Sequence, residues 1–187
     1  MRSLLSHAAL LTRDINKVLC ISRFAAFKIG AVVAFLRLAR KNPNLSFTLV
    51  GHGPFEFVIT FLVRLWSISN ITLRTDVGPS QLKDIISQHD IGYAQGTSIL
   101  EIAKLGKPVI IAPYSRLKDI FNSKFVTYGV FGFVDGKFIF GDLVNKQEYP
   151  SMSLQNALDD IILDYSNYKN ITLKTVKDYD SNVIFKL

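Results

Sequence analysis

Two cations near the N-terminus have a spacing that suits an anion-binding site. Arg23 ends a short apolar run, and Lys28 follows five residues later, at the expected start of a helix. The free amides and the dipole of a helix N-terminus attract negative charge, so the two cations and the helix together could bind a phosphate group. Most lysines and arginines are solvated surface residues, however, and the pair considered alone fits that interpretation better.

Glycines mark three further places where the backbone could approach a ligand. Gly51 and Gly53 follow a second apolar run, and Gly78 precedes a helical segment. Glycine permits a tight turn or a close backbone approach. The third glycine and the downstream acid of a dinucleotide-binding fingerprint are missing, which argues against an NAD site. The loop at Gly78 could line the pocket of a nucleotide base, or it could be only a turn.

The segment GTSILEIAKLGKPVI, which begins at Gly96, contains hydroxyl residues and one acid. Thr97 and Ser98 open a helix whose first amides have no partner within the helix and could receive phosphate. Glu101 lies three residues after Ser98, which is the spacing of a capping box, so its carboxylate could instead bond a backbone amide. Considered alone, Glu101 is best explained by the capping box.

The elements that must position these residues alternate between strands and helices. Strands are expected in the ranges 17–24, 46–54, 70–77, 90–96 and 107–113, and helices in the ranges 28–44, 54–69, 79–89 and 97–106. This alternation predicts an α/β fold, a single Rossmann-like domain with a mostly parallel sheet and helices on both faces. Ligands bind such a sheet at the carboxyl ends of its strands, and the candidate residues follow predicted strands.

The C-terminal part of the chain has a different pattern. Residues 128–142 suggest a hairpin that turns at Asp135 and Gly136, and the ranges 153–168 and 171–185 suggest two closing helices. We therefore expect one domain over residues 1–187. It comprises a connector or helix at 1–16, a ligand-binding core at 17–116, and the hairpin with the closing helices at 117–187.

Composition and charge limit the class of protein. The 187 residues are 49% apolar and 20% charged, as in a globular domain. The net charge of +7 favours phosphorylated small molecules or an anionic membrane face, and the dispersed basic residues argue against nucleic acid. Cys20, the single cysteine, lies in an apolar run and suggests a buried side chain in a reducing compartment. We recognise no secretory signal or membrane span, so the cytoplasm is the expected location.

Taken together, SRFAAFK, FTLVGHGP and GTSILEIAKLGKPVI resemble the C-terminal, donor-binding domain of GT-B glycosyltransferases. The resemblance covers residues 17–113 and is to the retaining group 1, or family 4, type found in bacterial polysaccharide and lipopolysaccharide assembly. It implies that Arg23 and Lys28 bind the donor diphosphate and assist catalysis, and that Glu101 bonds the ribose. It also implies phosphate contacts from Gly96, Thr97 and Ser98. Gly51, Gly53 and Gly78 are candidate ligand contacts through their place in the loops, apart from the resemblance.

The sequence departs from that family in two ways. The first acid of the family's E-x7-E motif, which contacts the donor sugar, falls on Tyr93. A GT-B enzyme also has two Rossmann domains, and this chain has room for one. The resemblance thus implies the nucleotide-sugar-binding half of a hexosyltransferase that acts only with an N-terminal acceptor domain or partner chain.

Two alternatives stay open at the level of sequence. The chain could be a non-catalytic Rossmann scaffold or a membrane-associated partner in a polysaccharide-assembly complex, peripheral at the inner membrane face. It could also be an unrelated enzyme for phosphorylated ligands on a flavodoxin-like sheet, because fold alone does not define function. We expect no cofactor and no metal ion, and the base of the donor is undetermined.

Overall fold

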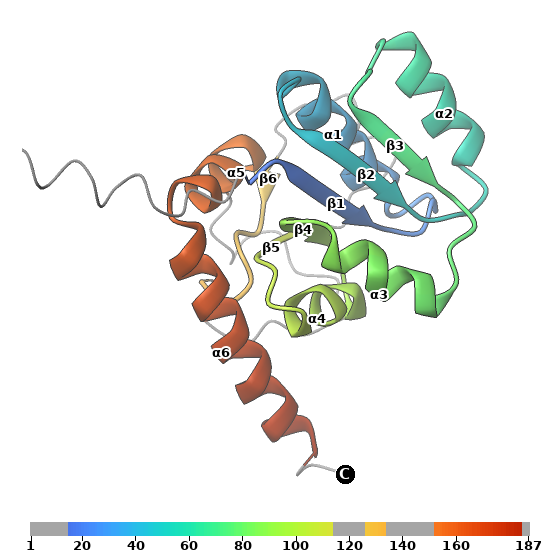
Figure 1. Ribbon diagram of the computed structural model, residues 1–187. Coiled ribbons are helices and arrows are strands. Elements are labelled where there is room, and N and C mark those ends of the chain that lie inside the picture. Colours follow the sequence, from blue (N-terminus) through green and yellow to red (C-terminus); the bar gives the residue numbers. More distant parts are fainter. Residues whose placement is uncertain (1–14, 114–125, 134–151, 185–187) are drawn as a thin grey trace, which may run out of the picture.

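Five parallel strands form the central sheet of the computed structural model (Figure 1), which describes residues 15–113, 126–133 and 152–184. The strands are β1 (Lys17–Ile21), β2 (Ser46–Val50), β3 (Ile71–Arg74), β4 (Ile91–Ala94) and β5 (Val109–Ile111). Their order in the sheet is β3-β2-β1-β4-β5. All five predicted strands are confirmed. Each ends before the predicted limit, because the residues that follow it belong to the loop after the strand.

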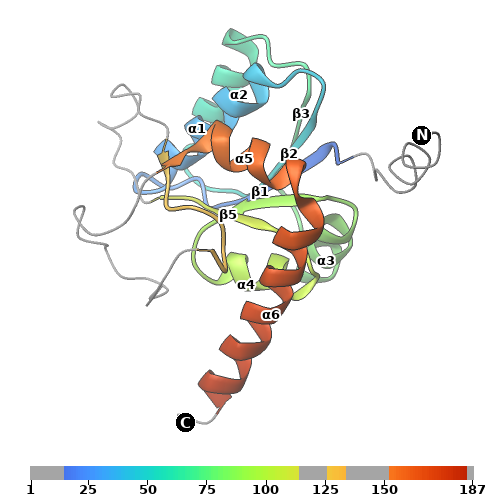
Figure 2. The ribbon, with the colours of Figure 1, turned by 90° about the vertical axis from the view of Figure 1, so that its left-hand side faces the viewer.

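Helices cover both faces of this sheet, as predicted. They are α1 (Ile29–Lys41), α2 (Glu56–Leu65), α3 (Pro79–Ser87), α4 (Thr97–Lys104), α5 (Leu154–Leu163) and α6 (Tyr165–Ile184). α1, α2 and α5 lie on one face, and α3, α4 and α6 on the other (Figures 1 and 2). The sheet is therefore the middle layer of three, which explains why its central strands are apolar on both faces.

Each face of the sheet has its own apolar core. On the α1 side, the Phe35 ring stacks on Tyr93 with the centroids 5.7 Å apart and meets Phe47 edge-on at 5.4 Å. On the α4 side, Ile102 packs so closely over β4 that a Cβ on Gly92 would lie 2.7 Å from its Cγ2 atom. This contact fixes the distance between α4 and the sheet, and with it the place of the α4 N-terminus.

The C-terminal region confirms the two closing helices and corrects the first arm of the predicted hairpin. The break between α5 and α6 falls at Asp164, earlier than predicted, and the Ser153 hydroxyl caps α5 by accepting the Asn156 N–H at 3.1 Å. Residues 131–133 form a turn, so the predicted first arm of the hairpin does not continue as a strand. Two short strands, β6 (Val126–Thr127) and β7 (Met152–Ser153), pair antiparallel instead. Asp135, Gly136 and residues 1–14 lie outside the described residues.

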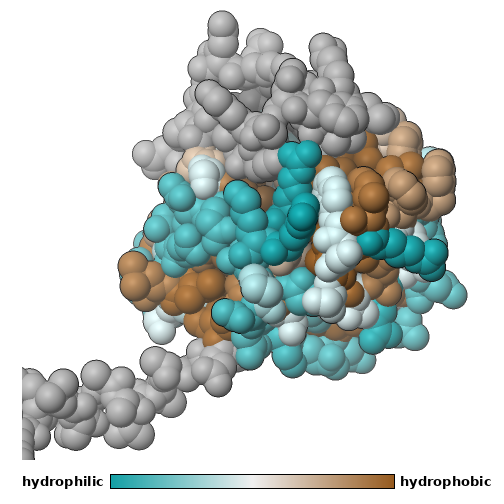
Figure 3. Space-filling model, turned by 90° about the horizontal axis from the view of Figure 1, so that it is seen from above, coloured by the Kyte–Doolittle hydropathy of each residue, from teal (hydrophilic) through white to brown (hydrophobic). Residues whose placement is uncertain are grey.

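Helix α2 keeps a row of apolar side chains on its outer surface. Phe57, Phe61 and Leu65 are spaced four residues apart and are 74%, 60% and 60% exposed. We call these three residues the α2 stripe. Figure 3, which looks down on the end of the molecule where α2 lies in Figure 1, shows hydrophobic surface beside hydrophilic surface. Within the described ranges, no helix combines the length and apolar character that crossing a bilayer requires.

Candidate functional site

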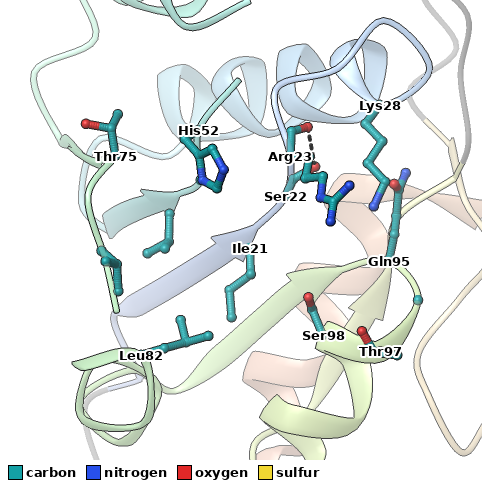
Figure 4. Close-up of a pocket in the computed structure, with 14 residues that line it drawn as sticks. Ile21, Ser22, Arg23, Lys28, His52, Thr75, Leu82, Gln95, Thr97 and Ser98 are labelled. Carbon is teal, nitrogen blue, oxygen red and sulfur yellow. Dashed lines mark hydrogen bonds between the residues drawn. The ribbon is translucent and has the colours of Figure 1, made fainter. Parts of the chain in front are cut away.

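A pocket of about 430 Å³ opens at the carboxyl edge of the sheet (Figure 4). Its walls are built from the ends of β1 and β2 and from the segments that follow β1, β2, β3 and β4. β1 and β4 are neighbours, and the chain order runs in opposite directions on either side of them, so the pocket lies at the topological switch point of the sheet. The described lining residues are Ile21, Ser22, Arg23, Lys28, Val50, Gly51, His52, Thr75, Val77, Leu82, Gln95, Gly96, Thr97 and Ser98.

Six of the nine residues singled out from the sequence line this pocket. They come from three separate loops and are Arg23, Lys28, Gly51, Gly96, Thr97 and Ser98. Gly53, Gly78 and Glu101 are not among the described lining residues, and Glu101 is exposed on α4. The fold thus brings most of the candidates together, while their roles toward a ligand remain predictions.

Arg23 and Lys28 give the pocket a positive character. Arg23 is exposed, Lys28 is half-buried, and none of the described residues that line the pocket is acidic. Burial lowers the pKa of the Lys28 ammonium from its ordinary value, and the nearby Arg23 charge lowers this pKa further. Both causes disfavour the charged form of Lys28. An anion bound between Lys28 and Arg23 would stabilise that charge, because it would offset both the burial and the repulsion from Arg23.

The N-terminus of α4 contributes backbone amides to the same wall. Gly96 is the N-cap, and its φ of +61° is a conformation that residues with a side chain rarely adopt. The helix begins at Thr97, so Ser98 lies inside the first turn and no side chain caps the helix. The predicted capping box between Ser98 and Glu101 is therefore wrong. With no side-chain cap, the first amides can be offered to an anion.

Gly51 and Gly53 are explained by contact between two loops. A Cβ on Gly51 would lie 1.8 Å from the Ser22 carbonyl oxygen, and one on Gly53 would lie 2.8 Å from that of Phe24. The loops are joined by backbone hydrogen bonds, with the Phe24 N–H donating to the His52 carbonyl oxygen at 2.9 Å. Glycine is thus required by this packing, which holds Arg23 at the pocket, whether or not a ligand approaches.

The position of the missing motif acid lies in the core. Tyr93 is 1% exposed, stacks on Phe35 and is not among the described residues that line the pocket. Burial raises the pKa of its phenol, and the neighbouring Cys20 raises it further. Cys20 is itself buried, as predicted, and burial raises the pKa of its thiol as well. A side chain at position 93 of this fold packs against α1 and does not face the pocket.

Eight described lining residues were not among the predicted site residues, and half of them are apolar. Ile21, Val77 and Leu82 line the pocket, and so does Gln95. Their positions in the chain could have indicated them, because Ile21 is the last residue of β1 and Gln95 directly follows β4, at the sheet edge where ligands bind. Within the described ranges, no three histidine, cysteine, aspartate or glutamate side chains come close enough together to hold a metal ion.

Comparison with known proteins identifies the fold. The sequence matches no protein-family model and no curated protein. Among solved structures, the C-terminal domain of the glycosyl transferase group 1 family protein LpcC from Francisella tularensis matches 89% of this chain with 85% of its own, at a TM-score of 0.54 and 15% identity.

Two longer proteins match with similar scores. S. aureus TarM, in a structure with UDP, has a TM-score of 0.53 and 17% identity, and the match covers 92% of this chain but 32% of TarM. UDP-GlcNAc 2-epimerase from Neisseria meningitidis, bound to UDP-GlcNAc, has a TM-score of 0.53 and 17% identity over 94% of this chain and 45% of the enzyme. The chain therefore has the fold of the C-terminal domain of GT-B glycosyltransferases, as the resemblance predicted, and spans about a third of TarM.

Proposed function

We propose that this chain binds a nucleoside diphosphate sugar and is the donor-binding half of a retaining glycosyltransferase of bacterial polysaccharide or lipopolysaccharide synthesis. One observation carries the proposal: Arg23, Lys28 and the uncapped N-terminus of α4 face one pocket at the switch point of the sheet. Two fixed cations and free helix amides are suited to two adjacent phosphates. TarM and the epimerase, which share this fold, were solved with UDP and UDP-GlcNAc.

The two cations would also assist the transfer itself. When the bond between the sugar and the diphosphate breaks, its electron pair moves onto the diphosphate, and negative charge grows there. Arg23 and Lys28 would stabilise this charge without a metal ion, Arg23 through paired N–H donors and Lys28 as a point charge. Because Lys28 is half-buried, its interaction with the developing charge is less screened than that of a surface lysine.

The apolar part of the pocket suits the nucleoside. Leu82 and Ile21 lie on the side of the pocket away from Lys28, and Arg23 lies between that side and Lys28 (Figure 4). A base and ribose placed there would put the diphosphate beside Arg23 and the α4 amides. Glu101 remains our proposed ribose ligand from the resemblance, although a carboxylate exposed on α4 would have to reach the ligand from outside the described pocket lining.

Transfer would require more than this domain. The chain spans 32% of TarM and 85% of the isolated LpcC domain, so an acceptor-binding domain or partner chain would supply the rest of the active site. By itself the chain would bind donor and transfer little sugar.

Calorimetric titration tests the proposal. The full chain is titrated with UDP, GDP and their sugars, and Arg23→Ala and Lys28→Ala are compared with Lys41→Ala, which removes an exposed cation at the end of α1. We expect binding to weaken about 10-fold or more in the two pocket variants, because each loses a charged hydrogen bond of about 1.5–3 kcal/mol, and to change little in the control. Absence of binding by the wild-type chain at millimolar nucleotide, or equal affinity in all three variants, would exclude the proposal.

A membrane-associated role is the second candidate, and the α2 stripe favours it. Three large apolar side chains on one exposed helix face could enter the headgroup region of a bilayer, and a net charge of +7 would attract anionic lipids. The chain would then lie at the inner face of the cytoplasmic membrane as a partner in a polysaccharide-assembly complex.

Co-sedimentation with vesicles of phosphatidylglycerol and phosphatidylcholine tests this second candidate. Phe57→Ser with Phe61→Ser should abolish sedimentation, whereas Leu163→Ser, which changes an 88% exposed apolar residue at the end of α5, should not. Sedimentation that survives Arg23→Ala and Lys28→Ala would favour the membrane role. Sedimentation that is equal in the α2 and α5 variants would count against it.

A further inference from the structure

One side chain in the pocket has a buried acceptor with no partner. Gln95 follows β4, is 4% exposed, and lines the pocket. Its Nε2 atom donates a hydrogen bond to the Pro113 carbonyl oxygen at 2.5 Å. Since a carbonyl only accepts, this bond determines which way round the amide lies. Its Oε1 atom is buried and has no hydrogen-bond partner among the residues that the structure describes.

A buried carbonyl oxygen without a partner is costly, because it has lost its bonds to water and gained none in return. Such groups are rare in folded proteins and call for a specific explanation. Here the oxygen belongs to a residue of the pocket wall, next to the N-cap of α4. A ligand that brings a hydrogen-bond donor into the pocket would satisfy it.

We propose that Gln95 Oε1 accepts a hydrogen bond from a hydroxyl group of the donor sugar, and that Gln95 thereby helps to select the sugar. This inference rests on the proposed function. It names the residue of the pocket that distinguishes a nucleotide sugar from the nucleotide alone.

The chemistry of the ligand excludes its diphosphate as the partner of this oxygen. The phosphate oxygens facing Arg23 and Lys28 are ionised at neutral pH and can only accept hydrogen bonds. Sugar hydroxyls can donate. A site that must pair a buried polar atom discriminates strongly against ligands that lack the matching group, which is how one acceptor can select among sugars.

The arrangement of the pocket places the sugar on the correct side. Figure 4 shows Gln95 and Lys28 at one end of the pocket and Leu82 at the other, with Arg23 between them. A nucleoside at the Leu82 end and a diphosphate at Arg23 leave the sugar at the end where Gln95 lies. The Lys28 ammonium could also donate a hydrogen bond to this oxygen. If Gln95 acted by holding Lys28, its loss would change the affinity for the nucleotide and for the nucleotide sugar by the same factor.

The test compares the nucleotide with its sugar conjugates in the full chain. Gln95→Met removes the acceptor and keeps the length of the side chain, and Gln88→Met makes the same change at an exposed position at the end of α3. The nucleotide is whichever of UDP and GDP binds. We expect Gln95→Met to bind this nucleotide within about 2-fold of the wild-type affinity and to bind the preferred nucleotide sugar about 10-fold more weakly than the wild-type chain. Gln88→Met should change neither affinity.

Deoxy analogues of that sugar provide a second readout. One of them should bind the wild-type chain about 10-fold more weakly than the intact donor, and it should lose nothing further in Gln95→Met. An equal loss for nucleotide and nucleotide sugar in Gln95→Met, or full affinity for every deoxy analogue, would overturn the inference while leaving the nucleotide site intact. If the wild-type chain bound neither UDP nor GDP, the proposed function would fail, and this inference with it.

Discussion

Replacing Gly51 with alanine tests whether the contact between the loops after β1 and β2 holds the anion site together. The added Cβ would lie 1.8 Å from the Ser22 carbonyl oxygen and 2.9 Å from the Phe24 ring. Contacts under 3.0 Å between a Cβ and backbone essentially never occur, so the two loops must move apart by more than 1 Å. Arg23 lies between Ser22 and Phe24 and would move with them.

The magnitude follows from the contacts that this movement disturbs. Forcing a methyl group into a packed site costs about 1–3 kcal/mol. The Ser22 N–H to Val50 carbonyl bond of 3.0 Å and the Phe24 N–H to His52 carbonyl bond of 2.9 Å would lengthen, at up to about 1 kcal/mol each. We therefore expect Gly51→Ala to lower the free energy of unfolding by roughly 2–4 kcal/mol and the Tm by roughly 4–16 °C.

Urea unfolding followed by circular dichroism measures the stability, and calorimetry measures UDP or GDP affinity in the same samples. Gly78→Ala is the matched control, because a Cβ there meets no atom within 4 Å. It should lower stability by about 1 kcal/mol or less, since alanine is a poorer N-cap than glycine. If Gly51→Ala were as stable as Gly78→Ala and bound nucleotide as well as the wild-type chain, the assigned role of the loop contact would be refuted.

Three further predictions concern charge and backbone. Nucleotide affinity should fall as pH rises towards 10.5, because the lowered pKa of Lys28 makes it lose its proton at a lower pH than an ordinary lysine, and Lys28→Arg should flatten the profile. Burial lowers the pKa of His89 below 6.5, so unfolding free energy measured in urea should fall as pH drops from 6.5 towards about 5, and less steeply in His89→Gln. Gly96→Ala should lower stability by about 1–3 kcal/mol in the same assay through its φ of +61° alone, since a Cβ there meets no atom within 4 Å; an unchanged stability would contradict this backbone conformation.

The sign of the His89 effect follows from its surroundings. The ring lies between Ile85, whose carbonyl oxygen is 2.6 Å from Nδ1, and Thr48, whose hydroxyl is 2.8 Å from Nε2. The carbonyl only accepts, so Nδ1 carries the proton of the neutral ring. Because the folded protein favours this neutral form, its stabilising contribution is complete above pH 6.5 and is lost as the unfolded chain takes up a proton.

Much of the fold could be predicted from the sequence, because its signals are local. A buried strand needs a short apolar run and a covering helix needs an apolar face, and both patterns are visible over a few residues. β1, β2, β4 and α4 were all predicted in this way. The presence of Arg23, Lys28 and Gly96 at one sheet edge follows from the same reasoning, because parallel strands bring their carboxyl ends together.

Predictions that depended on exact helix limits were less successful. The start of α4 at Thr97 was predicted, but the capping box at Ser98 was wrong because a capping box needs its hydroxyl residue at the N-cap, and the N-cap of α4 is Gly96. Tyr93 was judged only by its distance from Glu101 along the chain, whereas the pleat of β4 turns it into the core.

The sequence by itself determined the alternation of strands and helices, the positive charge and the residues available at the ends of the strands. Only the tertiary structure decided which of these residues share a pocket. It also decided that Gly51 packs against the Ser22 carbonyl group of another loop, and that the Gln95 Oε1 atom is buried without a hydrogen-bond partner. The physical reason is that periodicity and propensity act over a few neighbouring residues, whereas burial and hydrogen bonding depend on segments far apart in the chain. Pro113 lies 18 residues beyond Gln95, and it is the hydrogen bond between them that leaves Oε1 free for a ligand.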